Sequence, residues 1–251
     1  MSGHSKWSTI KRKKGAADAK RGQVFTRLAR EIAIAAREGG SDSDANFRLR
    51  LAIDKARANN MPKENIDRAI KKGVGEDKDG VSIEEMMYEG YGPKGVALII
   101  SVVTDNRNRA VAEIRHILNR HGGSLGEGGS VAWQFKHIAY FSFPAEGHDP
   151  DAIFELAVEA GADDVKFEDD TIEIVAPVEA FKQISDTLHK SKIHPDEAGL
   201  KMIPINEIEL SKEDSLHVLR VVEALEEIDD IQEVFSNLGL SDELLAQLEA
   251  E

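Results

Sequence analysis

The period of the apolar residues changes near residue 73, and this change constrains the fold more than any other feature of the chain. Before it, apolar side chains recur at helical spacing in short segments, which is typical of amphipathic helices. After it, alternating or continuous apolar runs stand between turn residues, which is typical of strands. The Gly-rich, charged stretch Gly73–Gly80 has the composition of a linker. The sequence therefore predicts a helical N-terminal part and a separate α+β part.

Three short helices are predicted in the N-terminal part: over residues 20–37, from a cap at Asp44 onward, and over residues 62–72. Residues 1–18, which precede them, lack apolar periodicity and are predicted to be an arm that is mobile when unbound. In the first helix, the face opposite the apolar stripe is basic and is interrupted by Ile34. The cations of that face are Lys20, Arg27, Arg30 and Arg37.

The α+β part begins with a predicted hairpin, made of a strand around residues 86–91 and a buried strand over residues 96–104. A helix over residues 107–121 and a strand near residues 131–135 follow. The next predicted elements are strand 137–143, helix 149–161, strands 165–167 and 171–175, helix 177–190 and a strand within 200–209. Their order is βαββαβ, the ferredoxin-like arrangement. A helix capped by Ser211 and a strand near residues 231–235 would then complete the first sheet domain, so that the second is an insertion.

The predicted fold class is α+β, with an N-terminal three-helix bundle followed by two ferredoxin-like α+β domains, the middle one discontinuous. The expected boundaries are residues 1–78 for the basic arm and the three-helix domain, residues 79–135 plus 204–251 for the discontinuous domain, and residues 136–203 for the inserted domain.

Charge is distributed very unevenly along the chain. The formal net charge of -14 would by itself repel a polyanion. Residues 1–72, however, hold 18 Lys and Arg against 8 Asp and Glu, a balance of +10, so the remainder carries -14 minus +10, or -24. This asymmetry indicates a polyanionic partner for the N-terminal part. The acidic remainder could contact a protein partner or serve solubility alone.

The arm is densely basic and contains one aromatic residue, Trp7. Lys and Arg neutralise phosphates, and an indole can stack on an exposed base. A solvated tail is the alternative, which the presence of Trp disfavours; for the basic helix face, an ordinary exposed face is an equally open alternative. The expected nucleic-acid-binding residues of the arm and helix are Lys6, Trp7, Lys11, Arg12, Lys13, Lys14, Lys20, Arg21, Arg27 and Arg30.

A second candidate cluster lies where a predicted strand gives way to a helix, at Thr104–Arg109. Positive charge in the first turn of a helix interacts unfavourably with the helix dipole, so the presence of Arg107 and Arg109 there needs an explanation. One reason is an anion, because backbone N–H groups at that terminus together with two guanidinium groups would bind a phosphate or an acidic surface. A local ion pair with Asp105 or Glu113 is an equally open alternative.

The sequence contains no motif that supports an enzyme. Because there are no cysteines, thiolate catalysis and cysteine metal sites are excluded, and no HExxH pair is present, so neither a cofactor nor a metal is expected. The loop Gly122–Ser130 lacks the ending of a P-loop and is predicted to be a flexible connector. The longest apolar run, Val96–Val103, is too short to span a membrane. We expect a cytoplasmic, monomeric, non-enzymatic protein.

Several motifs resemble those of the YebC/PmpR family, over nearly the whole chain. They are SGHSKW at residues 2–7, YEGYGP at 88–93, TDNRNR at 104–109, GGSLGEGGSVAWQF at 122–135, and Ile203–Asn206. Ala198-Gly199 departs from the family, which usually shows Ala-Glu there. The resemblance implies a three-helix domain joined to two α+β domains around a cleft, and a role in gene expression.

The resemblance implies two possible functions. Some members of the family are described as DNA-binding transcriptional regulators, which is the function expected here. Others, including a mitochondrial translational activator, resemble ribosome-associated factors that assist the synthesis of difficult sequences such as proline runs, and binding to ribosomal or transfer RNA is therefore the alternative. No recognition helix with an obvious base-reading set is present, which favours recognition of backbone or shape.

Overall fold

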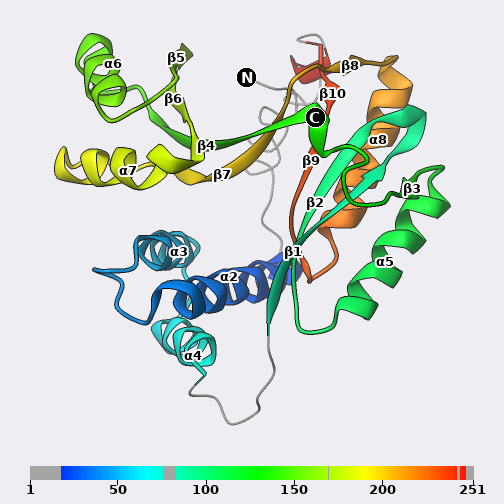
Figure 1. Cartoon of the computed structure of the whole chain (residues 1–251), viewed down its shortest axis with the longest axis horizontal. Coiled ribbons are helices and arrows are strands. Elements are labelled where there is room, and N and C mark those ends of the chain that lie inside the picture. Colours follow the sequence, from blue (N-terminus) through cyan, green and yellow to red (C-terminus); the bar gives the residue numbers. More distant parts are fainter. Residues whose placement is uncertain (1–17, 76–82, 169, 242–243, 247–251) are drawn as a thin grey trace. The chain divides into compact units, whose positions relative to one another are not determined.

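The computed structural model describes residues 18–75, 83–168, 170–241 and 244–246 (Figure 1). The chain divides into two compact units, one formed by residues 1–134 together with 204–251, and the other by residues 135–203. The second unit is therefore an insertion in the first. The fold class is α+β, as predicted, with a helical region first and the sheets after it.

Three helices form the start of the first unit: α2 (Asp18–Gly39), α3 (Phe47–Ala58) and α4 (Lys63–Gly73). Their apolar stripes pack into one core, which includes Leu28, Ile32, Leu49, Ala52, Ile53 and Ile66. The predicted cap at Asp44 is wrong, because the side chain of Asn46 caps α3 by accepting a hydrogen bond from Leu49 N at 3.1 Å. At the end of α4, a Cβ at Gly73 would lie 2.2 Å from Ala33 O, so glycine allows α4 to approach α2 closely.

The first unit also contains a four-stranded antiparallel sheet of order β3-β1-β2-β9. Its strands are β1 (Glu84–Tyr91), β2 (Ala97–Thr104), β3 (Ser124–Leu125) and β9 (Ile231–Ser236). The first two form the predicted hairpin around the short 3-10 turn η1 (Pro93–Gly95). Helices α5 (Arg107–Arg120) and α8 (Lys212–Glu226) lie side by side and share one core with the sheet (Figure 1).

The helical region packs against this sheet through a small apolar cluster. Ile34, which interrupts the basic face of α2 in the sequence, is 3% exposed and clusters with Ala33, Ile83 and Val103. Helices α5 and α8 thus share a core with Leu98, Ile100 and Val102 of β2. Helix α2 contacts the same strand at Val103. This contact buries Val103, and every residue of β2 is buried, as its continuous apolar run predicts.

The predicted strand at residues 131–135 is wrong. Residues Ala132–Gln134 form a 3-10 turn, η2, and a single longer strand, β4 (Phe135–Pro144), begins after it. The reason is that the backbone N–H groups of Val131 and Ala132 donate to the carboxylate of Glu89 instead of to a neighbouring strand. The strand expected within residues 200–209 is likewise divided into β7 (Glu197–Pro204) and a two-residue strand, β8 (Ile208–Glu209), which pairs with β10 (Leu238–Gly239).

The inserted unit has the predicted βαββαβ order and a sheet of order β5-β6-β4-β7. After β4 come α6 (Pro150–Glu159), β5 (Asp164–Glu168), β6 (Thr171–Ala176), the 3-10 turn η3 (Val178–Ala180), α7 (Phe181–Lys190) and β7. Phe141, Phe143, Ile172, Ile174, Ile184 and Leu188 form the centre of its core. None of the described helices has the length and hydropathy required to cross a lipid bilayer.

Candidate nucleic-acid interface

The segment Thr104–Arg109 fixes the positions of two arginines at the start of α5. Thr104 Oγ1 accepts a hydrogen bond from Asn106 N at 2.9 Å, and the side chain of Asn106 caps α5 by accepting one from Arg109 N at 3.0 Å. Successive helical residues are about 100° apart, so Arg107 and Arg109 are about 200° apart and project from different sides of the helix.

Arg107 lines a groove in the first unit where three segments of the chain meet. Strand β1, helix α5 and the glycine-rich loop after α5 enclose a volume of about 730 Å³. These segments contain the motifs YEGYGP, TDNRNR and GGSLGEGGSVAWQF. Among the residues that line the groove are Tyr88, Glu89, Arg107, Val111, Arg115 and Gly126. The fold therefore brings together motifs that lie up to about 40 residues apart in the sequence.

Two exposed guanidinium groups give this groove its positive charge. Arg107 and Arg115 lie on one face of α5, two helical steps of four residues apart, which corresponds to about 12 Å along the helix axis. In the part of the chain that the structure describes, neither forms an ion pair. Arg115 was not among the residues expected from the sequence, although its helical spacing from Arg107 is a signal that could have identified it.

Glu89 is the one carboxylate among the residues that line the groove. Its two oxygens accept hydrogen bonds from Gly129 N at 2.7 Å, Val131 N at 2.7 Å and Ala132 N at 2.8 Å. Desolvation acts to raise the pKa of Glu89, but the three backbone hydrogen bonds together hold this pKa below its ordinary value. The carboxylate of Glu89 thus binds the backbone of the loop. The sequence predicted this loop to be a flexible connector, whereas in the structure these hydrogen bonds hold it against β1.

The loop also approaches β1 closely at a glycine. A Cβ at Gly123 would lie 2.3 Å from Tyr91 O, which no side chain could tolerate without a shift of the backbone. On the same strand, Tyr91 Oη donates a hydrogen bond to Ser130 O at 3.0 Å. The wall of the groove opposite α5 therefore depends on a glycine and on polar contacts to the backbone of the loop.

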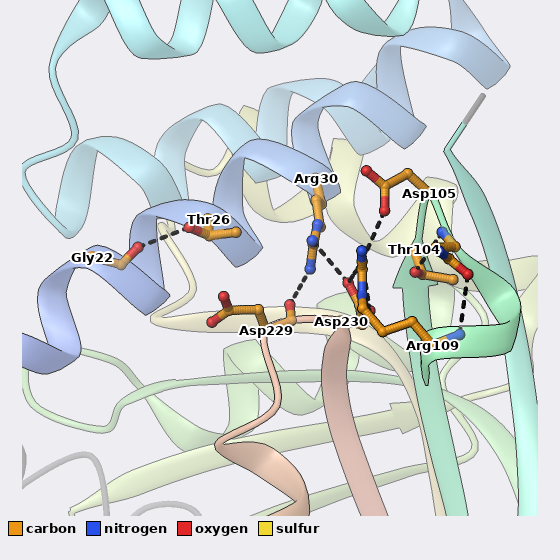
Figure 2. Close-up of polar contacts among 9 residues, drawn as sticks. Gly22, Thr26, Arg30, Thr104, Asp105, Arg109, Asp229 and Asp230 are labelled. Carbon is orange, nitrogen blue, oxygen red and sulfur yellow. Dashed lines mark hydrogen bonds and ion pairs between the residues drawn. The ribbon is translucent and has the colours of Figure 1, made fainter. Parts of the chain in front are cut away.

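Arg109, in contrast, belongs to an ion-pair cluster around the buried carboxylate of Asp230, which Figure 2 shows. Arg109 Nη2 lies 2.9 Å from Asp230 Oδ2 and 2.8 Å from Asp105 Oδ1. Arg30 Nη2 of α2 lies 2.8 Å from Asp230 Oδ1, so both guanidinium groups point at one carboxylate that is only 1% exposed (Figure 2). The local ion pair that the sequence left open for Arg109 is present, and Asp230 is a second partner that the sequence did not indicate.

Further polar side chains of α2 contact the C-terminal end of α8 and the turn that follows it. The guanidinium group of Arg27 donates to Glu226 O, that of Arg30 donates to Asp229 O, and Gln23 Nε2 donates to Glu227 O at 3.3 Å. Carbonyl groups at a helix end lack intrahelical partners and attract cations. The basic face of α2 thus docks the helical region onto the sheet, and the structure gives Arg27 and Arg30 internal partners.

The remaining expected residues lie partly outside the described region. Lys6, Trp7, Lys11, Arg12, Lys13 and Lys14 precede it, and the side chains of Lys20 and Arg21, although these residues are in α2, are not described. Helix α4 adds four exposed cations that were not among the expected residues: Lys63, Arg68, Lys71 and Lys72. None of these four has an ion-pair partner among the described residues, and Glu64 and Asp67 are exposed on the same helix.

An exposed tryptophan was also missed. The indole of Trp133 in η2 is 71% exposed, and its Nε1 donates a hydrogen bond to Ser130 O at 3.1 Å. Trp133 directly follows Ala132, whose backbone N–H donates to Glu89. An indole this exposed can stack on a base. Among the described residues, no group of three or more His, Cys, Asp or Glu side chains could hold a metal ion.

Comparison with known proteins gives consistent matches over the chain. The family model described as the TACO1/YebC protein N-terminal domain matches residues 5–76, and the one described as the TACO1/YebC second and third domain matches residues 83–238. A relative from Acidithiobacillus ferrooxidans is 52% identical, covering 100% of this chain and 99% of its own, and one from Syntrophus aciditrophicus is 48% identical, covering 100% of both. Each is named a probable transcriptional regulatory protein. The crystal structure of a conserved hypothetical protein from Aquifex aeolicus is similar, with a TM-score of 0.80, 39% identity, and coverage of 90% of this chain and 93% of that one.

Proposed function

Because this chain belongs to the TACO1/YebC family, we propose that it is a cytoplasmic, non-enzymatic regulator of gene expression that binds nucleic acid, as a DNA-binding transcriptional regulator. The name of its relatives, probable transcriptional regulatory protein, supports the choice of DNA. The observation that carries the proposal is the groove between β1, α5 and the glycine-rich loop, where two exposed arginines have no ion-pair partner among the described residues.

The groove suits a phosphate backbone for electrostatic reasons. Arg107 and Arg115 could each bind phosphate oxygens through two parallel N–H groups, at points about 12 Å apart along α5. The carboxylate of Glu89 would repel phosphates if it were free, but its oxygens accept three backbone hydrogen bonds. The basic arm, with Lys6, Trp7 and the cations at residues 11–14, and the exposed cations of α4 would add further phosphate contacts.

The groove can be tested by measuring affinity at several salt concentrations for a labelled DNA duplex. Replacing both Arg107 and Arg115 by Ala should weaken binding by about tenfold or more and reduce the slope of log affinity against log salt by about 2, about one for each lost phosphate contact. A control variant, Arg120→Ala/Lys190→Ala, removes the same charge from exposed positions outside the groove. Equal losses in both variants would contradict phosphate binding in the groove.

One observation favours a second candidate, binding to structured RNA in a ribosome-associated translation factor that relieves stalling. The 71% exposed indole of Trp133 suits unpaired bases, which RNA loops present and a DNA duplex does not.

Two experiments separate the two candidates. Crosslinking in cells followed by sequencing of the bound nucleic acid should recover promoter DNA in the first case and ribosomal or transfer RNA in the second. In vitro, Trp133→Ala should leave the affinity for duplex DNA unchanged but weaken binding to an RNA hairpin loop about tenfold if the indole stacks on a base. Recovery of neither kind of nucleic acid would contradict the proposed function.

A further inference from the structure

The inserted unit exposes large apolar side chains on two elements that contact each other. Phe154 and Val158 of α6 are 49% and 47% exposed, and Phe167 of β5 is 42% exposed. Helix α6 packs against β5, which is one of the two edge strands of its sheet (Figure 1). Single exposed apolar residues are ordinary on a protein surface, but three on adjoining elements of a small unit indicate an interaction surface.

The apolar residues are bordered by a ridge of carboxylates. Asp151, Glu155 and Glu159 are exposed at successive helical steps of four, which form one ridge of α6, and Phe154 and Val158 form the neighbouring ridge. Asp164, at the start of β5, is exposed as well. We call Phe154, Val158 and Phe167, with Asp151, Glu155 and Glu159, the α6/β5 face.

The charge of the inserted unit limits what this face can bind. Residues 135–203 contain 6 Lys and no Arg against 15 Asp and Glu, so their net charge is 6 minus 15, or -9. A nucleic acid or an anionic lipid surface would be repelled. A second copy of the same face would oppose carboxylates to carboxylates, which also disfavours self-association.

We propose that the α6/β5 face binds a basic amphipathic helix of a protein partner. The apolar ridge of such a helix would cover Phe154, Val158 and Phe167, and its Lys or Arg residues would lie along the carboxylate ridge. Buried apolar area would supply the affinity, whereas the charges would select the partner and its orientation. Since α6 has 10 residues and is therefore about 15 Å long, a helix of about three turns would cover it. This surface is separate from the groove in the first unit and does not depend on nucleic-acid binding.

The proposal can be tested with the full chain and a fluorescent peptide of about 16 residues in which Leu and Lys form adjacent stripes at helical spacing. A peptide of the same composition with shuffled residues keeps the charge but lacks the stripes. The striped peptide should bind about tenfold more tightly than the shuffled one, as measured by fluorescence anisotropy. Equal affinities would overturn the proposal, because they would reduce the interaction to unspecific attraction between charges.

Two pairs of substitutions locate the binding on the chain. Phe154→Ser/Val158→Ser and Glu155→Lys/Glu159→Lys should each weaken binding of the striped peptide about tenfold. The control Glu146→Lys/Glu179→Lys makes the same change of charge at exposed positions of the same unit outside this face, and should change affinity less than about twofold. Equal losses in the control would overturn the proposal.

Sedimentation of the chain alone tests the other possible occupant. The chain should stay monomeric, and Phe154→Ser/Val158→Ser should sediment in the same way. A dimer that this pair of substitutions dissociates would overturn the proposal and assign the face to a second copy. Thermal unfolding of all variants should remain cooperative, with a modest decrease in the midpoint for Phe154→Ser/Val158→Ser, because about half of each of these two side chains is exposed.

Discussion

Arg107 and Arg109 are two residues apart at the start of α5, yet they contact different parts of the first unit. Arg107 lines the groove beside β1, whereas Arg109 Nη2 lies 2.9 Å from Asp230 Oδ2 just before β9. One helical turn therefore leaves one arginine exposed in the groove and uses the other to hold α5 in place. Through Asp230, the same cluster includes Arg30 and so joins the sheet to α2. The orientation of the groove is thus coupled to the docking of the helical region.

Asp230→Ala should destabilise the protein by about 3 kcal/mol. Its carboxylate is 1% exposed and pairs with two guanidinium groups, and removal of one partner from a buried ion pair leaves charge uncompensated. This loss of stability is at the low end of the usual range for a broken buried ion pair, because the side chain of Arg109 is 43% exposed and can be hydrated. Asp229→Ala is the matched control, since Arg30 contacts only the backbone carbonyl of Asp229. Urea unfolding should show a loss of at most about 0.5 kcal/mol for the control, and similar losses in both variants would refute the role of Asp230.

The contribution of Asp105 should depend on pH. Its hydrogen bond with Arg109 holds the pKa of Asp105 below its ordinary value of about 3.9. A carboxylate with a lowered folded-state pKa stabilises the fold above its unfolded-state pKa, and this stabilisation is lost as the pH falls through the folded-state pKa. The free energy of unfolding of the unmodified chain should therefore exceed that of Asp105→Asn at pH 6. Below about pH 4 the difference should shrink. A difference that stays constant down to acid pH would show that the ionised form of Asp105 is not what stabilises the fold.

Glu89→Gln should loosen the glycine-rich loop. The amide side chain has one acceptor oxygen where the carboxylate has two, so the three N–H groups of Gly129, Val131 and Ala132 cannot all keep their partner. The local loss is about 1–2 kcal/mol, and hydrogen exchange at these amides should speed up about tenfold. Glu127→Gln is the control, because Glu127 is an exposed glutamate of the same loop. Unchanged exchange in Glu89→Gln would mean that other contacts hold the loop.

Elements with their own local signals could be predicted from the sequence. The βαββαβ order of the inserted unit was confirmed because Pro150 begins a helix, Pro177 precedes the 3-10 turn that leads into α7, and Gly161 follows the end of α6, so each boundary has a nearby cause. The buried stripe of α2 and the continuous apolar run of β2 could also be predicted, because each is a pattern within one short segment of the sequence. The TDNRNR motif correctly indicated a capped helix with arginines in its first turn.

Contacts between distant residues had no such signal. Arg30 and Asp230 are 200 positions apart, and both lie among many charged residues, so no local pattern distinguishes them from exposed charges. The error at residues 131–135 has a related cause, because the apolar pattern there predicts a strand, while the distant carboxylate of Glu89 binds the backbone N–H groups that a strand would require. Ile34 was the one local hint, since an apolar residue on a basic face indicates a contact.

A pair of glycines in the loop that borders the groove provides a test of its backbone path. At Gly123 an added Cβ would lie 2.3 Å from Tyr91 O, whereas at Gly128 no atom lies within 4 Å of the added Cβ. Gly123→Ala must therefore push the loop away from β1 and should destabilise the protein by about 1–3 kcal/mol, the usual effect of overpacking. Gly128→Ala has open space and should be within about 0.5 kcal/mol of the unmodified chain. Because both substitutions add one methyl group to the same loop, changes in the unfolded state nearly cancel between them. Urea unfolding measures the difference, and equal stability of the two variants would contradict the close approach of the loop to Tyr91.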